Sequence, residues 1–238
     1  MKKASIGLNS TALRLLAMIL MLIDHVGAVL FPEAVWMRIV GRLAFPIFAF
    51  QTAQGYRHTR DFKGYCLRLV LFGLVSEIPF NLMISGHPLY PFHQNVMFTL
   101  LLGLLVLWQL DGLQADQTVG KRLARLEKLA LLMLVGVFLF ADYGLLGVMT
   151  VVVFHLFREK KPAQLIALAA IHVFGYDSAD LSLFGGAVQF PIQSFAVLAL
   201  IPIWLYNGEK GPGGKGFQYA AYAFYPAHML LLALTQIL

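Results

Sequence analysis

Two ionisable residues, Asp24 and His25, stand side by side inside an apolar segment of the chain. The segment runs from Leu15 to Phe31 and reads LLAMILMLIDHVGAVLF. It has the character of a membrane-spanning helix, and an ionisable side chain in a bilayer costs about 2.5–3.5 kcal/mol on insertion scales. The pair is therefore most simply explained if it faces a polar cavity whose walls are formed by the rest of the chain.

The composition indicates an integral membrane protein. Of the 238 residues, 59% are hydrophobic and 13% are charged, whereas soluble domains carry about 25% charged residues. The mean hydropathy is +0.74. The net charge of +6 does not indicate a nucleic-acid partner, because basic residues of a multi-pass protein mark its cytoplasmic loops. A single cysteine, Cys66, allows no intramolecular disulfide, and we expect no metal site.

The apolar runs predict an all-α protein, a polytopic membrane helix bundle of about nine transmembrane helices in one domain over residues 1–238. The runs are continuous rather than alternating, which favours helices over strands. The expected helices cover residues 11–31, 36–54, 65–84, 93–110, 127–141, 144–157, 163–175, 188–206 and 218–237.

The connecting segments alternate in charge. Residues 54–64, 111–128, 158–161 and 207–218 contain Lys or Arg, whereas 85–92, 142–143 and 175–189 contain neither, the last carrying Asp177 and Asp180 instead. By the positive-inside rule, the N-terminus is predicted inside and the C-terminus outside, in the inner (cytoplasmic) membrane of a bacterium. Arg38 and Arg42 oppose this trend at the outer end of the second expected helix.

With this topology, polar side chains gather in the outer half of the membrane, which predicts a functional site there. The expected catalytic residues are His25, Asp24, Arg42, Glu77 and Asn95. The expected substrate-binding residues are Arg38, Asn81, His93, Gln94, Thr99, Asp142, Tyr143 and His228.

Helix geometry separates the roles of Asp24 and His25. Adjacent helical residues point about 100° apart, so Asp24 is poorly placed to orient His25 and is expected to pair with Arg38 or Arg42. His25 is then free to act as a base, because an imidazole titrates near pH 6.5, about where a proton acceptor is needed. Arg42 needs a carboxylate partner, either Asp24 or Glu77. A purely structural ion pair between helices stays open as the alternative.

Several stretches resemble the TraX family, in family order and over nearly the whole chain. They are LIDHVGAVLFP (22–32), RIVGRLAFPIFAFQTAQGYRHTRD (38–61), LFGLVSEIPFNL (71–82), HQNVMFTLLLG (93–103), DYGLLGV (142–148), ALIPIWLYNG (199–208) and FYPAHMLLL (224–232). The resemblance implies an integral membrane acyltransferase that takes acyl groups from coenzyme A, and the founding member acetylates the N-terminus of F-type pilin. The membrane-embedded histidine of such enzymes would correspond to His25. Gln51, Thr52 and Gln54 depart from the usual pattern of the family, which more often has an acid at position 54.

The resulting hypothesis is transfer of an acetyl group from acetyl-CoA to an amine, such as a pilin N-terminus, or to a hydroxyl acceptor in the membrane or envelope. His25 is the expected general base. Arg42, with Asn95 or Tyr143, is expected to stabilise the oxyanion, while Asp24 and Glu77 hold the arginine.

The cytoplasmic loop residues Arg57, Arg60 and Lys63 are expected to meet the phosphates of coenzyme A. Expected partners are membrane lipid and the acceptor, with no nucleic acid; the sequence does not predict an oligomeric state. A proton-coupled transporter of a small solute is the alternative, ranked second because no internal repeat is visible and the charge is one-sided. A non-enzymatic scaffold ranks last, since it has no need of buried charges.

Overall fold

The computed structural model describes residues 7–176, 181–183 and 188–237. Its helices are α1 (Ser10–Val29), α2 (Val35–Gly41), α3 (Ala44–His58), α4 (Phe62–Ser85), α5 (Val96–Ala115), α6 (Val119–Phe138), α7 (Gly144–Leu156), α8 (Lys161–Phe174), α9 (Leu200–Trp204) and α10 (Gly214–Ile237). A 3-10 helix, η2, covers Ile192–Ala199. A small antiparallel hairpin joins β1 (Leu181–Leu183) to β2 (Val188–Phe190), with Leu181 opposite Phe190. Asp177 and Asp180 lie outside the described residues.

Side chains at the helix ends fix where the long helices start and stop. The side-chain oxygen of Asn9 accepts a hydrogen bond from the backbone N–H of Ala12 at 2.9 Å, and Asp61 accepts one from Gly64 at 2.8 Å at the start of α4. Each satisfies a backbone donor that the first turn of a helix leaves free. Gly86 ends α4 in the left-handed region at φ 71°, which glycine adopts without steric cost.

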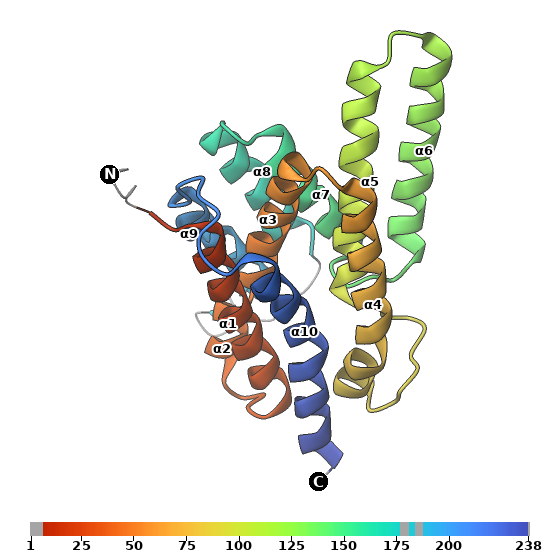
Figure 1. The fold of residues 1–238 in the computed structure, drawn as a ribbon. Helices are drawn as coiled ribbons and strands as arrows, with labels where there is room; N and C mark the ends of the chain where they lie inside the picture. The colour runs from red at the N-terminus through yellow and green to blue at the C-terminus, as the bar shows by residue number, and fades with distance from the viewer. Residues whose placement is uncertain (1–6, 177–180, 184–187, 238) are drawn as a thin grey trace.

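Helix α3 lies at the centre of the bundle and packs against α1, α5 and α7 (Figure 1). Helix α2 packs on α1, α10 runs along α4 and α1, and α6 covers α5. The fully buried core surrounds α3 and includes Ile47, Ala49, Leu104, Leu107 and Val151.

The two ends of the bundle differ in charge. The turns after α3, α5 and α7 lie at one end, called the basic end below (Figure 1). Lys and Arg residues gather in these turns and in the adjoining helix ends, among them Arg60, Lys121, Arg122, Arg158 and Lys160. The α1–α2 turn, the α4–α5 connection and the C-terminus lie at the far end. The all-α prediction is thus confirmed, and the order of the turns agrees with the alternation of loop charge.

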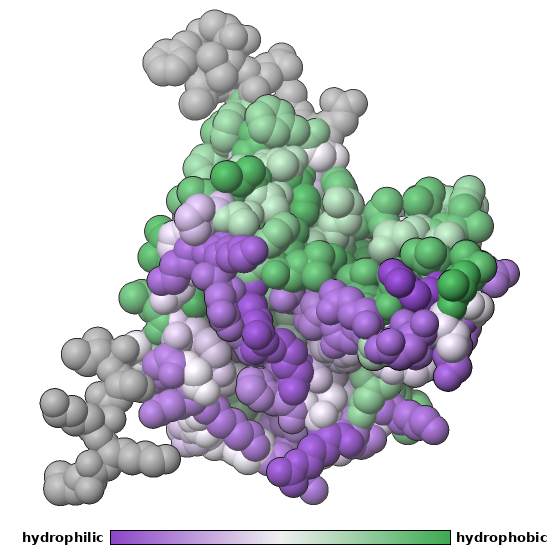
Figure 2. Space-filling view, turned by 90° about the horizontal axis from the view of Figure 1, so that it is seen from above, coloured by the Kyte–Doolittle hydropathy of each residue, from purple (hydrophilic) through white to green (hydrophobic). Residues whose placement is uncertain are grey.

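The sides of the bundle are apolar, as a lipid-facing surface must be. Along α4, exposed apolar residues recur at helical spacing on one face: Leu67, Leu71, Leu74, Val75 and Ile78, each more than half exposed. Figure 2 shows hydrophilic side chains gathered on the face seen from above, with hydrophobic surface mainly above and to the right of them in this view. Among the described residues, α1, α4 and α5 are long and apolar enough to cross a membrane. The chain is therefore a membrane protein, while the count of nine spans stays a prediction.

Two expected helices were wrong as continuous elements, and in each a proline follows the irregular stretch. The helix expected at 36–54 breaks between α2 and α3 at Arg42 and Leu43, because Pro46 has no N–H for the carbonyl of Arg42, four residues earlier. The stretch expected as a helix at 188–206 begins as strand β2, continues as η2 and becomes α-helical only at α9. There Pro202 cannot donate to the carbonyl of Leu198.

The other differences concern boundaries and strands. Helix α6 begins at Val119 rather than 127, so Lys121, Arg122 and Arg125 are helical instead of belonging to a loop. The described residues also include one short hairpin, which pairs three residues on each side and leaves the all-helical class of the bundle unchanged.

Candidate functional site

Asp24 of α1 is held between two arginines of the α2 segment. Its Oδ2 accepts from Arg42 Nη2 in a short ion pair and lies 3.0 Å from Arg38 Nη1. Arg38 Nη1 also donates to the backbone carbonyl of Asp24 at 3.0 Å. The Asp24 side chain is 9% exposed, and those of Arg42 and Arg38 are 16% and 33% exposed. The prediction that Asp24 pairs with these arginines is confirmed, and it pairs with both.

Gly41 makes this pairing possible. A Cβ placed on Gly41 would collide with the carboxylate and Cβ of Asp24. Gly27 likewise leaves room for the Met37 side chain, where an added Cβ would lie only 2.6 Å from that of Met37. The two glycines therefore let α1 and α2 approach closely, so that the Asp24 carboxylate reaches the backbone of α2 beside Arg42.

Two polar atoms in this cluster are buried without a partner among the described residues. They are Asp24 Oδ1 and Arg42 Nε. A buried polar atom left unpaired costs about 1–3 kcal/mol, so each is a natural contact for a polar group of a ligand or for water. Arg42 Nη1 makes a long 3.4 Å bond to Gln193 Oε1, which ties the arginine to η2.

His25 is paired with His228 of α10. His25 Nδ1 lies 2.7 Å from His228 Nε2, and His228 Nδ1 lies 2.7 Å from the carbonyl oxygen of Phe224. Because a carbonyl only accepts, His228 Nδ1 carries a proton, and in the neutral ring Nε2 accepts. His25 Nδ1 must then be the donor, which leaves the lone pair of His25 on Nε2. The second histidine thus fixes the tautomer that a general base requires.

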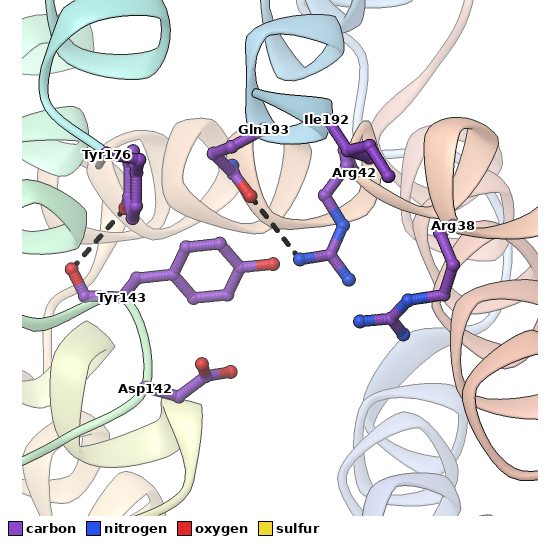
Figure 3. A pocket seen from close by; sticks show the side chains of 7 residues that line it. All are labelled: Arg38, Arg42, Asp142, Tyr143, Tyr176, Ile192 and Gln193. Carbon is purple, nitrogen blue, oxygen red and sulfur yellow. Dashed lines mark hydrogen bonds between the residues drawn. The ribbon is translucent and has the colours of Figure 1, made fainter. Parts of the chain in front are cut away.

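Tyr143 occupies a strained turn opposite the arginines. Its backbone is left-handed at φ 64°, a conformation that a bulky residue rarely adopts and that is often found at functional sites. Its ring stacks on Phe45 of α3, with centroids 3.9 Å apart. In Figure 3 the hydroxyl end of Tyr143 points toward the guanidinium of Arg42, and the Asp142 carboxylate and Arg38 point into the same space.

These side chains border two cavities. The arginine cavity, of about 320 Å³, is lined by Arg38, Arg42, Asp142, Tyr143, Tyr176, Ile192 and Gln193 (Figure 3). The histidine cavity, of about 30 Å³, is lined by residues that include Asp24, His25, Phe48, Val96, Asp142, Tyr143 and Tyr225. Asp142 and Tyr143 line both cavities and therefore stand between His25 and the arginine cavity.

The structure does not bring Glu77 to Arg42. Glu77 Oε1 accepts from the backbone N–H of Asn95 at 2.8 Å and, in a short bond, from Asn95 Nδ2. Asn95 Nδ2 also donates to the carbonyl of Gly73 at 2.8 Å, and its Oδ1 caps α5 by accepting from Met97 at 3.0 Å. Both amide protons of Asn95 are thus engaged in joining α4 to α5. The expectation that Glu77 holds Arg42 is therefore corrected, because the carboxylate that pairs with Arg42 is that of Asp24.

Two other predicted binding residues, Gln94 and Thr99, form hydrogen bonds with the turn that precedes α7. Gln94 pairs with the turn before Tyr143, accepting from Asp142 N at 2.8 Å and donating to the Phe140 carbonyl at 2.9 Å. Thr99 donates a short hydrogen bond to the Asp142 carbonyl. These bonds hold the turn that carries Tyr143. Asn81, in α4, is buried, and its Oδ1 has no partner among the described residues.

His93 precedes α5 and faces the carboxylate of Asp142. His93 Nε2 lies 3.6 Å from Asp142 Oδ1, and both side chains are 35% exposed. The contact with Asp142 raises the pKa of His93 above its ordinary value of 6.5, against the opposing effect of partial burial. Protonation of His93 therefore strengthens its hold on one wall of the arginine cavity.

The three residues expected to meet coenzyme A lie at the basic end, away from His25. Arg57 lines an open pocket of about 550 Å³ with Phe62, Trp108 and Arg158, among others. Arg60 and Lys63 are exposed, and neither lines a cavity described above. Their role stays a prediction. The described residues contain no group of three or more His, Cys, Asp or Glu side chains arranged to hold a metal.

The sequence analysis missed the amide that contacts Arg42 and two tyrosines of the cavity walls. Gln193 accepts from Arg42, and its Nε2 lies 3.2 Å from Nδ1 of His172, a fully buried ring. Tyr176 and Tyr225 complete the cavity walls. The available signal was the presence of amides and a histidine inside apolar segments, but nothing in the sequence showed that those segments face Arg42.

Comparison with known proteins places the chain in a family. A family model described as "TraX protein" matches residues 9–236. The protein named "Probable fimbrial assembly protein FimC, serogroup H1" from Dichelobacter nodosus is 31% identical, over 96% of this chain and 96% of its own length. "Protein TraX" from Escherichia coli is 26% identical over 74% of this chain and 70% of its own. No solved structure matches. The matched length and the shared sequence show that the chain belongs to the TraX family.

Proposed function

We propose that the chain is an integral membrane acetyltransferase that moves an acetyl group from acetyl-CoA to an amine or hydroxyl acceptor. The observation that carries the proposal is the chain of hydrogen bonds from His25 through His228 to the Phe224 carbonyl. It leaves His25 Nε2 as a proton acceptor beside a cavity shared with Asp24 and Tyr143. A base beside fixed cationic and hydroxyl donors is the arrangement that acyl transfer needs.

The proposed reaction uses His25 twice. The acceptor nitrogen or oxygen forms a bond to the thioester carbonyl carbon while its proton passes to His25 Nε2. The C–S bond of the tetrahedral intermediate then breaks, and His25 returns the proton to the departing thiolate. The products are the acetylated acceptor and free coenzyme A, so atoms and charge balance.

Arg42 and Tyr143 are the proposed oxyanion donors. Arg42 Nε is a buried donor without a partner among the described residues, and the Tyr143 hydroxyl points toward the same guanidinium (Figure 3). Removing one such donor from an acyl-transfer enzyme typically lowers kcat by about 100–1000-fold. Asn95 is less suited to this role than the sequence suggested, because both of its amide protons are engaged.

The acceptor is proposed to be a membrane or envelope molecule. The larger arginine cavity, at about 320 Å³, is its proposed binding site. The names of the two relatives, one of which includes fimbrial assembly, favour a pilin N-terminus as the first acceptor to test.

We further propose nine spans in the bacterial inner membrane, with the basic end in the cytoplasm.

The proposal is tested with purified protein in detergent and radiolabelled acetyl-CoA. Wild type should release free coenzyme A and label a membrane-inserted peptide with a free N-terminus, whereas His25→Ala should reduce both rates by about 100–10,000-fold, the usual contribution of a general base. His87→Ala is the matched control, because His87 is exposed in the connection between α4 and α5. Wild-type protein that neither transfers nor hydrolyses acetyl-CoA would refute the enzyme assignment.

A proton-coupled transporter of a small solute is kept as the second candidate, because one observation favours it. Paired histidines with a single shared proton can also pass protons, and here His25 and His228 lie within the bundle. Reconstituted liposomes with an internal pH dye separate the two functions. A transporter would move protons when its solute is added without acetyl-CoA, whereas the acetyltransferase would not.

A further inference from the structure

The histidine cavity shares Asp142 and Tyr143 with the arginine cavity, and it shares Phe48 with a third cavity on the side of the basic end. The tyrosine cavity, of about 90 Å³, lies between α1, α3, α4, α5 and α10, where its walls include Arg14, Gln51, Tyr65 and Tyr222. We propose that it binds the linear arm of a coenzyme A thioester and delivers the acetyl group to His25. This inference rests on the acetyltransferase proposal and names the path of its donor.

Phe48 of α3 is the wall between the tyrosine and histidine cavities, since it lines both. In the α3 segment from Ala44 to Phe50, all residues except Phe48 are buried, and Phe48 is half-buried. Its side chain packs against the core and at the same time borders both cavities. A rotation of one aromatic side chain would join the two cavities, without movement of a helix.

The polarity of the tyrosine cavity changes along its length in the way a thioester donor requires. Arg14 Nε makes a long 3.4 Å bond to Gln51 Oε1, and Gln51 Nε2 donates to the Ser10 carbonyl at 2.8 Å. Leu69 and Leu100, together with Phe48, make the other part of the lining apolar. A narrow space with a cation and amides at one part and apolar walls at the other suits an unbranched arm attached to an anion.

The positive charge of Arg14 could bind that anion. Arg14 makes no ion pair with a carboxylate among the described residues. Its guanidinium lies 5.9 Å from the ring centre of Phe217, near the start of α10. Lys215 is exposed in the first turn of the same helix. These cations would meet the phosphates of the donor, because exposed or half-buried cations without a carboxylate partner attract anions.

The two substrates would then reach His25 from opposite sides. The donor would pass Phe48 from the tyrosine cavity, and the acceptor would pass Tyr143 from the arginine cavity. The thiolate formed when the C–S bond breaks would take its proton from His25 and leave through the tyrosine cavity as a thiol. No acyl relay through the membrane is needed in this arrangement.

Protection of an introduced cysteine tests the path directly. Ala221 lines the tyrosine cavity, whereas Ala220 is the preceding residue of the same helix and is exposed. The two cysteine variants, Ala221→Cys and Ala220→Cys, are made in a Cys66→Ser background, which removes the free thiol. They are labelled with a small, charged thiosulfonate in membrane vesicles whose cytoplasmic side faces out. The competing probe is desulfo-coenzyme A, which has no thiol to react with the label.

We expect desulfo-coenzyme A to slow labelling of Ala221→Cys at least fivefold and to leave labelling of Ala220→Cys unchanged. Equal rates with and without the probe at both positions would overturn the proposal. Labelling needs no turnover, so this result is independent of the enzyme assignment. Protein that gains protection but never transfers acetyl groups would support the binding site and refute the proposed function.

Phe48→Trp tests the passage to His25. The larger ring should reduce acetyl transfer at least tenfold while protection of Ala221→Cys persists, and Phe48→Leu should keep most of the activity. Full activity in Phe48→Trp would overturn the path. Persistent protection of Ala221→Cys by desulfo-coenzyme A shows that the Phe48→Trp protein is folded, so loss of activity by unfolding is recognised.

Discussion

Replacing Asp24 with asparagine tests the ion-pair cluster without changing its shape. Asparagine has the same outline as aspartate, so it still fits against Gly41, where even a Cβ would collide. The substitution removes the one negative charge that Arg38 and Arg42 share through Oδ2. Breaking a buried ion pair by removing one partner costs about 3–5 kcal/mol. Asparagine keeps one oxygen acceptor, and the Arg38 side chain is 33% exposed, so water compensates part of the loss. We expect the free energy of unfolding to fall by roughly 2–4 kcal/mol.

The measurement is thermal unfolding in a mild detergent, followed by tryptophan fluorescence. On the scaling of globular domains of this length, 1 kcal/mol corresponds to about 2–4 °C, so Tm should fall by roughly 5–15 °C. The control is Asp61→Asn, because Asp61 is 69% exposed, lies 3.9 Å from Arg68, and caps α4 through an oxygen that asparagine retains. Its Tm should change by no more than about 2 °C, as expected for a surface pair. An Asp24→Asn protein as stable as wild type would refute the view that this carboxylate holds the arginines together.

Three further predictions concern the groups around this cluster. Gly41→Ala should destabilise the protein by about 1–3 kcal/mol through overpacking against Asp24, measured by the same unfolding assay; an unchanged Tm would contradict the close approach of α1 and α2. Asn95→Ala should cost about 2–3 kcal/mol, because a helix cap and a buried hydrogen-bonded link between helices are lost together; a loss below 1 kcal/mol would contradict this. The raised pKa of His93 beside Asp142 gives stability that is fully present below the ordinary pKa and is lost as pH rises through the raised one. Unfolding at a series of pH values should show this loss above about pH 6.5 in wild type and not in His93→Gln.

The sequence was enough to predict the ion pair for two reasons. Its partners are close along the chain, and any unpaired charge inside a membrane is energetically unfavourable. Arg38 and Arg42 lie one turn apart, and the helix that carries them follows directly on α1. An acid inside a membrane segment needs a cation, and the expected topology put these two arginines in the same outer half of the membrane as Asp24. The helix interruption at Arg42 could also have been predicted, because Pro46, four residues later, has no N–H to donate to the carbonyl of Arg42.

The partner of His25 could not be found in the same way. His228 is 203 residues away, and periodicity shows which face of a helix is polar but not which helix lies against it. Gln193 could not be found for a related reason: its segment resembled one more spanning helix, whereas it forms a 3-10 helix that packs against α8 and α3. The identities of polar residues were therefore predictable, whereas their pairing across the bundle required the fold.

The charge balance of the cluster explains why two adjacent ionisable residues of α1 can serve one site. Asp24 neutralises one of the two positive charges of Arg38 and Arg42, so these three side chains retain one net positive charge, and the Asp142 carboxylate faces them across the arginine cavity (Figure 3). A permanent excess of positive charge is unfavourable in the resting protein. It becomes favourable when negative charge develops on a bound carbonyl oxygen, which is the condition for stabilising a transition state more than a ground state. His25 points to α10 instead, and its hydrogen bond to His228 keeps it out of the ion pair. A carboxylate that satisfied both arginines fully would make a more stable helix junction and a poorer oxyanion site.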